Sequence, residues 1–342
     1  MSAAALLAPW IDRQLRLLLG QRGHARLLQG PSGLGQYDLA LALARSWLCD
    51  TPDADGVACG RCASCHAVDV RTHADLRVLM PEVQMQALDW PLPQRAQAEI
   101  DDKKRKPSRE IRVDAMREAV EFAQRTDARG RGKVVLVYPA EQMNGITANA
   151  LLKTLEEPNG DVRFVLASEA AHQLLPTIRS RCQAHAMQWP SDDEMCAWLE
   201  GQGIAAADVA PLLRAAGGRP DDALGYARAG RDPRRWALLP RAVAQGDTTV
   251  FADWRPAEVV SALQKLCHDL SAVRAGAAPR YFAPEDLPAA PSWQALARWS
   301  KVLAAEARTA EHPFQAGLML EALVSGAQNV LHSRQTRSQA PR

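Results

Sequence analysis

The segment at positions 30–37 reads Gly30-Pro31-Ser32-Gly33-Leu34-Gly35-Gln36-Tyr37, and it follows a short apolar run, Arg26-Leu27-Leu28-Gln29. A working phosphate-binding loop of this shape reads G-x-x-x-x-G-K-[ST], because its lysine neutralises the β- and γ-phosphates and its hydroxyl binds magnesium. Here Gln36 replaces the lysine and Tyr37 replaces the hydroxyl residue, whereas Gly30, Gly33 and Gly35 keep the backbone turn. We interpret the segment as the degenerate loop of a nucleotide-hydrolysing fold, with an ordinary glycine-rich turn between a strand and a helix as the alternative.

Short apolar runs alternate with helical periods from residue 24 to about 187. This alternation predicts a parallel α/β domain with buried strands at 25–28, 76–80, 134–138 and 164–167. Helices are predicted between them, at 36–48, 113–125 and 147–157. The polar, proline-containing segment 81–108 is predicted to be a loop.

The strand pattern disappears after Trp189-Pro190, and the remainder of the chain reads as helical. We therefore expect three domains: an α/β domain at 1–188, a small helical domain at 189–232 and a larger helical domain at 233–334. The polar end of the chain, 335–342, is expected to be disordered.

The overall charge favours no particular partner, because 41 basic and 39 acidic residues leave a net charge of only +2. Nucleic-acid binding would need local basic patches. The chain starts without a basic region followed by a long apolar run, so we expect neither a secretory signal nor a membrane anchor, and a cytoplasmic location.

Four of the seven cysteines lie within one short loop: Cys49, Cys59, Cys62 and Cys65. Four thiolates suit tetrahedral zinc and leave no open coordination position, so the sequence predicts a structural zinc site. The alternative is a set of buried free cysteines, which the polar residues between them disfavour. His66 and His73 are interpreted as ordinary polar residues, with replacement of Cys49 by one of them as the alternative.

A second element of nucleotide chemistry is missing at the end of the strand predicted at 134–138. An ATPase needs acidic residues there, one for magnesium and one that activates water. The residues at those places are Tyr138 and Pro139, and Glu141 lies too far along to replace them well.

Two further motifs carry a family resemblance: Asn149-Ala150-Leu151-Leu152-Lys153-Thr154-Leu155-Glu156-Glu157-Pro158 and Thr177-Ile178-Arg179-Ser180-Arg181-Cys182. Together they resemble the AAA+ clamp-loader subunits of the bacterial replicative polymerase, DNA polymerase III. The resemblance implies an AAA+ domain, a helical lid and a helical collar that joins subunits into a ring of five. It also implies that Arg181, flanked by Ser180 and Cys182, acts in trans as an arginine finger at a neighbouring ATP site.

The same resemblance implies partners: the gamma or tau ATPase and delta subunits, and through the complex the sliding clamp and primed DNA. ATPase members also place an arginine in the lid, where this chain has Asp221 or, after a small shift of the alignment, Arg219. The basic insert Lys103-Lys104-Arg105-Lys106-Pro107-Ser108-Arg109 departs from the family pattern. We interpret it as a solvated, flexible loop, with contact to DNA phosphates as the alternative.

The sequence therefore predicts a clamp-loader subunit that organises the complex, neither binds nor hydrolyses ATP, and supplies Arg181 to a neighbour. Two alternatives stay open. One is an active ATPase motor subunit, and the other is a zinc-containing nucleic-acid-binding protein that acts alone.

Overall fold

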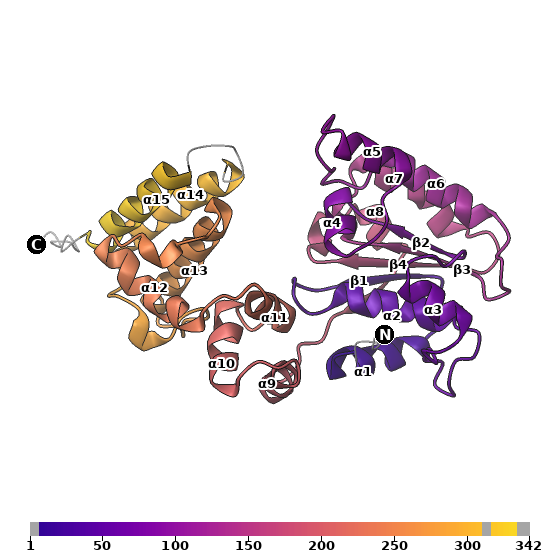
Figure 1. Cartoon of the computed structure of the whole chain (residues 1–342), viewed down its shortest axis with the longest axis horizontal. Coiled ribbons are helices and arrows are strands. Elements are labelled where there is room, and N and C mark those ends of the chain that lie inside the picture. The colour runs from indigo at the N-terminus through magenta and orange to yellow at the C-terminus, as the bar shows by residue number, and fades with distance from the viewer. Residues whose placement is uncertain (1–6, 310–315, 334–342) are drawn as a thin grey trace, which may run out of the picture. The chain divides into compact units, whose positions relative to one another are not determined.

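The computed structural model describes residues 7–309 and 316–333, and the predicted tail at 335–342 lies outside them. The chain divides into two compact units, Met1–Trp198 and Leu199–Arg342. The first is α/β and the second is helical (Figure 1).

A five-stranded parallel sheet forms the centre of the first unit, with the strand order β2-β3-β4-β1-β5. Its strands are β1 (Ala25–Gln29), β2 (Leu76–Leu79), β3 (Lys133–Val137), β4 (Val162–Ser168) and β5 (Gln183–Ala186). The first four overlap the four predicted apolar runs. The fifth strand escaped prediction, because it is a polar edge strand whose residues are mostly exposed.

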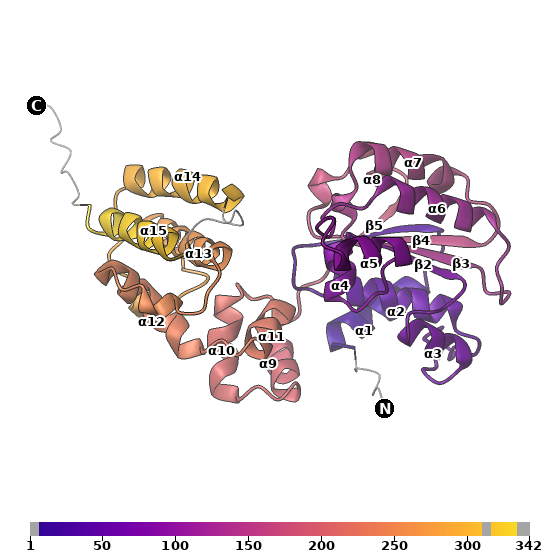
Figure 2. The ribbon, with the colours of Figure 1, turned by 45° about the horizontal axis from the view of Figure 1, so that its top comes forward.

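Helices cover both faces of this sheet (Figures 1 and 2). Val135 and Val137 of β3 share one core with α6 (Val113–Gln124) and α7 (Gly145–Glu156). Leu136 of the same strand shares the opposite core with α1 (Pro9–Leu19) and α2 (Gln36–Leu48). Successive residues of a strand point to opposite faces, so a sheet covered on both sides requires the unbroken apolar runs seen in the sequence.

The prediction of a loop at 81–108 is wrong, because this segment contains α4 (Glu82–Ala87) and α5 (Gln94–Asp101). Pro81 and Pro93 directly precede the two helices, where a proline interrupts no helical hydrogen bond. Glu82 is 6% exposed and accepts hydrogen bonds from Arg105 and from the Ser108 backbone N–H, which ties the two ends of the segment together. The remaining short helices of the unit are α3 (Ala63–Asp69), α8 (Pro176–Arg179) and the 3-10 turns Ala140–Gln142 and Ala171–Gln173.

The second unit is entirely helical in its described part, as predicted. Helix α9 (Asp192–Gly201) crosses the boundary between the units. It is followed by α10 (Ala206–Ala215), α11 (Pro220–Arg228), α12 (Pro233–Gln245), α13 (Pro256–Arg274), α14 (Trp293–Thr309) and α15 (Ala316–Leu331), with 3-10 turns at Thr249–Phe251 and Pro284–Asp286. Helices α10 and α12–α15 share one core that includes Trp236, Leu263 and Trp299. The division of these helices into two domains at 232 stays a prediction.

No helix in the described part of the chain is both long and apolar enough to cross a membrane.

Candidate functional site

The glycine-rich loop connects β1 to α2 at the carboxyl ends of the parallel strands; we call this side of the sheet the carboxyl edge. Gly35 precedes α2 with a φ of 83°, in the left-handed region that favours glycine. Because β3, β4 and β1 are neighbours in the sheet, Tyr138, Glu169 and Gly30 follow three adjacent strands at this edge. In open α/β sheets, ligands bind at this edge.

The side chain of Gln36 is folded back onto the loop. It is 2% exposed, and its Nε2 atom donates to the backbone oxygens of Gly30 at 2.9 Å and Pro31 at 2.7 Å. The two N–H groups of this amide are thus used within the loop itself, whereas the lysine of a working loop reaches the phosphates.

The side chain of Tyr37 lies against Tyr138, with ring centroids 5.3 Å apart. Its hydroxyl oxygen accepts a hydrogen bond from Trp90 Nε1 at 2.7 Å, and the Tyr138 hydroxyl donates to Glu169 Oε1 at 2.8 Å. Burial raises the pKa of both phenols, and the Glu169 carboxylate raises that of Tyr138 further. The residues at the two positions predicted for a magnesium ligand and an acidic residue are therefore two neutral rings that lie against each other.

Trp90 and Glu169 are members of this site that the sequence did not reveal. Trp90 lies in the segment predicted to be a loop, and the guanidinium of Arg71 sits 4.7 Å from its ring centroid. Glu169 directly follows β4, so its position at the carboxyl end of a predicted strand was the only feature of the sequence that could have indicated its place in this site. Glu141 supports it, because its Oε1 atom accepts a hydrogen bond from the Glu169 backbone N–H at 3.1 Å.

Arg181 lies between α8 and β5 and is fixed at two points. Its Nη1 atom donates to the Thr177 backbone oxygen at 3.0 Å, and its Nη2 atom contacts the Glu156 carboxylate. The flanking Ser180 hydroxyl also donates to Thr177, at 3.2 Å, while burial raises the pKa of the Cys182 thiol to about 11. The motif is thus held against its own chain, with the Arg181 side chain 28% exposed.

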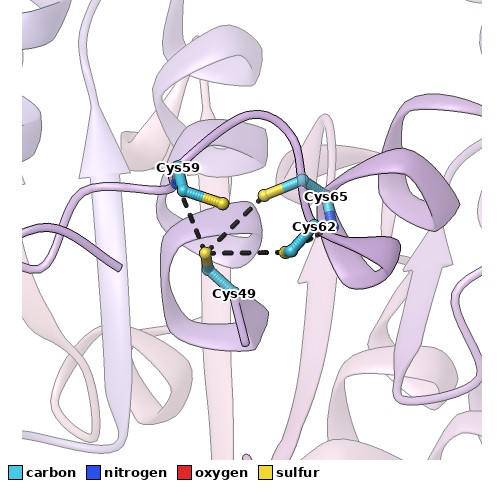
Figure 3. Close-up of side chains that lie close together, drawn as sticks. All are labelled: Cys49, Cys59, Cys62 and Cys65. Carbon is cyan, nitrogen blue, oxygen red and sulfur yellow. Dashed lines mark hydrogen bonds between the residues drawn. The ribbon is translucent and has the colours of Figure 1, made fainter. Parts of the chain in front are cut away.

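The four clustered cysteines meet around one point, and Figure 3 shows their thiol groups directed toward one another. All four sulfurs lie within 4.8 Å of one another; Cys49 Sγ is 3.8 Å from Cys62 Sγ and 3.7 Å from Cys65 Sγ. A zinc–sulfur bond of about 2.3 Å gives a tetrahedron whose sulfurs are about 3.8 Å apart. The residues therefore fit a tetrahedral metal ion.

The cysteines are brought together by local structure. Cys49 directly follows α2, Cys62 precedes α3 and Cys65 lies in the first turn of α3. Asp50 accepts hydrogen bonds from the Ser64 hydroxyl and N–H, which fixes the start of α3. Among the described residues, neither His66 nor His73 belongs to the cysteine group. The Nδ1 atom of His73 instead accepts a hydrogen bond from the Asp75 backbone N–H at 3.0 Å.

The basic insert is not a flexible, solvated loop throughout. Arg105 donates to Glu82 and to Glu99 at 2.8 Å each, and its side chain is only 23% exposed. Lys104 contacts Asp102 at 2.8 Å, whereas Lys103 and Lys106 are exposed. Acidic residues that precede the insert therefore neutralise part of its positive charge, and contact of the remainder with DNA stays a hypothesis.

The two candidates for the lid position lie at the start of α11. Arg219 precedes the helix and contacts the Ala216 oxygen and the Asp222 carboxylate, each at 2.9 Å, and Asp221 lies in the first turn. The choice between them remains a prediction.

Known proteins resemble the chain over most of the α/β unit. Residues 14–190 match the family described as DNA polymerase III, delta subunit. The DNA polymerase III subunit delta' of Pseudomonas aeruginosa is 41% identical over 216 residues, 62% of this chain and 58% of that protein. The subunit of the same name from Escherichia coli is 32% identical over 222 residues, covering 63% and 59%. The chain thus matches less than two thirds of the length of either relative.

Among solved structures, a gamma subunit-related protein from Thermotoga maritima aligns with 94% of this chain and 99% of its own, at a TM-score of 0.50 and 15% identity. At this level of identity the likeness concerns the fold alone.

Proposed function

The chain belongs to the delta-prime family of DNA polymerase III clamp-loader subunits, and we propose that it works there as a subunit that neither binds nor hydrolyses ATP. Its fold is that of an AAA+ protein, a parallel sheet flanked by helices and followed by helical domains. In this proposal it organises the complex and donates Arg181 to the ATP site of a neighbouring subunit.

One observation carries the proposal: the loop and strand ends that would hold magnesium-ATP are filled by the protein's own side chains. To admit phosphate, Gln36 would have to break both of its hydrogen bonds, each contributing about 1 kcal/mol, and Tyr37 would have to leave its contacts with Trp90 and Tyr138. Displacing Gln36 and Tyr37 would still leave the site without an ammonium group for the phosphates and without a carboxylate for magnesium. Micromolar affinity for ATP requires about 8 kcal/mol of net binding free energy, and breaking the contacts of Gln36 and Tyr37 would reduce the free energy available for binding.

The trans role of Arg181 is supported by its place in the chain. It stands in the Ser-Arg-Cys motif, after α8 and before the edge strand β5, and its side chain is partly exposed. A guanidinium is planar and permanently charged, so it can stabilise charge that develops on a γ-phosphate.

We further propose that the cysteine group holds one structural zinc ion. Four thiolates from this chain would complete its coordination and leave no position for a substrate. The ion would fix the loop between α2 and α3, and it has no part in ATP chemistry.

The proposed partners are the gamma or tau and delta subunits, with the sliding clamp and primed DNA reached through the complex in the cytoplasm. The proposed assembly with such subunits is supported by relatives named DNA polymerase III subunit tau. One of them, from Salmonella typhimurium, is 32% identical over 166 residues.

Titration of the isolated chain with magnesium-ATP in a calorimeter tests the proposal. We expect no saturable heat at sub-millimolar concentrations. A micromolar dissociation constant would instead support an active ATPase motor subunit, and tight, salt-sensitive DNA binding by the isolated chain would support a protein that acts alone.

A further inference from the structure

We propose that Glu156 is the positioning residue of the arginine finger: it fixes the guanidinium of Arg181 before a neighbouring ATP site closes on it. This inference rests on the proposed trans role of Arg181, and it assigns the carboxylate at the end of α7 a part in that reaction.

Two separate elements hold the guanidinium. Glu156 is the last residue of α7, and Arg181 follows Ser180, the C-cap residue of α8. Nη2 contacts the Glu156 carboxylate and Nη1 donates to the backbone oxygen of Thr177 in α8. Contacts to two nitrogens of a planar group define its position and its plane, which one contact to a flexible side chain would not do.

The fixed guanidinium keeps capacity for a further partner. It carries five N–H groups, two on each terminal nitrogen and one on Nε. The described contacts use one on each terminal nitrogen, and Nε is buried without a partner among the described residues. One N–H on each terminal nitrogen therefore remains, and such a pair suits the oxygens of a phosphate.

The exposure of the pair means that it contributes little to fold stability. The Glu156 side chain is 53% exposed and that of Arg181 is 28% exposed, and ion pairs at such sites stabilise a fold little. Holding a long, flexible side chain in one rotamer before the reaction matters more for catalysis, because a misplacement of about 1 Å can lower a rate by about a hundredfold.

The test uses the complex reconstituted from this chain and its ATPase partner subunits, with clamp and primed DNA. Glu156→Ala should lower the finger-dependent part of kcat by about three- to tenfold, less than Arg181→Ala does, and leave the KM for ATP unchanged, because the finger acts on charge that develops in the transition state. Glu156→Gln should fall between Glu156→Ala and the unmodified chain, since its amide oxygen can still accept from Arg181 without the charge. Glu157→Gln is the matched control: it removes an exposed carboxylate one residue further on and should leave kcat unchanged.

A double replacement separates positioning from an independent effect. In the Arg181→Ala background, Glu156→Ala should cause no further loss; an additional loss, or a Glu157→Gln effect of equal size, overturns the inference. Full activity of Glu156→Ala beside a clear defect of Arg181→Ala also overturns it and leaves the finger assignment intact. If Arg181→Ala itself has no effect, the proposed function fails and this inference fails with it.

Discussion

Replacing Cys62 with serine should release the zinc ion that we propose for the cysteine group and loosen the loop between α2 and α3 without unfolding the sheet. Cys62 Sγ lies 3.8 Å from Cys49 Sγ, which matches the edge of a zinc–thiolate tetrahedron of about 3.8 Å. Structural zinc binds to small peptides with about 10–16 kcal/mol of apparent free energy. If each of four ligands supplies a quarter, the loss is about 2.5–4 kcal/mol, or roughly 100- to 1,000-fold in affinity.

The sheet should survive this loss, because its two main cores draw almost all of their residues from outside the cysteine loop at 49–65. Phe164 and Leu27 pack with α6 and α7 on one face, and Leu28 packs with α1 and α2 on the other. Val57, in the loop between Cys49 and Cys59, packs at the margin of this second core, and a small separate cluster contains Leu48 of α2 and Val68 of α3. We therefore expect a native far-ultraviolet circular dichroism spectrum, with faster amide exchange confined to residues 49–69.

Plasma emission spectrometry of purified protein, after dialysis against a competing chelator, measures the effect. The unmodified chain and Cys196→Ser, which removes a half-buried cysteine outside the cluster, should both keep about one zinc per chain. Cys62→Ser should keep almost none. Equal zinc content and equal chelator resistance in all three proteins would refute the tetrahedral site.

Two further predictions concern the glycine-rich loop at 30–37 and the segment 82–108. Gln36→Lys alone should not restore ATP hydrolysis, because no acidic residue stands at Tyr138 or Pro139; a phosphate-release assay giving turnover above the unmodified chain would contradict this. Burial opposes ionisation of Glu82, but the Arg105 guanidinium and the Ser108 N–H more than offset it and hold the pKa of this carboxyl below its ordinary value. Its stabilising effect is therefore present above about pH 4.5 and lost as the pH falls through the folded-state pKa. Over that pH range the protection of residues 82–108 against hydrogen exchange, taken relative to the intrinsic exchange rate at each pH, should fall, and Glu82→Gln should show no such fall.

The sequence alone was sufficient to predict the buried strands and the cysteine group, because their patterns lie within short segments of the chain. The strands β3 and β4 are continuous apolar runs because both of their faces are buried, and this pattern is visible without a structure. The cysteine group was predictable for a similar reason, since its ligands lie within seventeen residues of chain and share one chemistry.

Contacts between distant segments could not be predicted in this way. Trp90 meets Tyr37 across 53 positions, and Glu156 meets Arg181 across 25. Trp90 and Glu156 alone are ordinary loop and helical residues, and only the packing of the segment 81–108 and of α7 brings them to their partners. Strand β5 escaped because an exposed edge strand needs no apolar run.

The most direct test of the central claim is the ATPase rate of the reconstituted clamp loader carrying Arg181→Ala, measured with sliding clamp and primed DNA. One arginine finger contributes about 10³–10⁵ in rate at its own site, so the summed rate of several sites should fall by less than this but clearly. Arg181→Lys should rescue poorly, because a point charge on a flexible stem does not reproduce the guanidinium fork. We expect the Arg181→Ala chain to fold, enter the complex and slow both ATP turnover and clamp loading; turnover and loading at the unmodified rate would contradict the proposed role of Arg181.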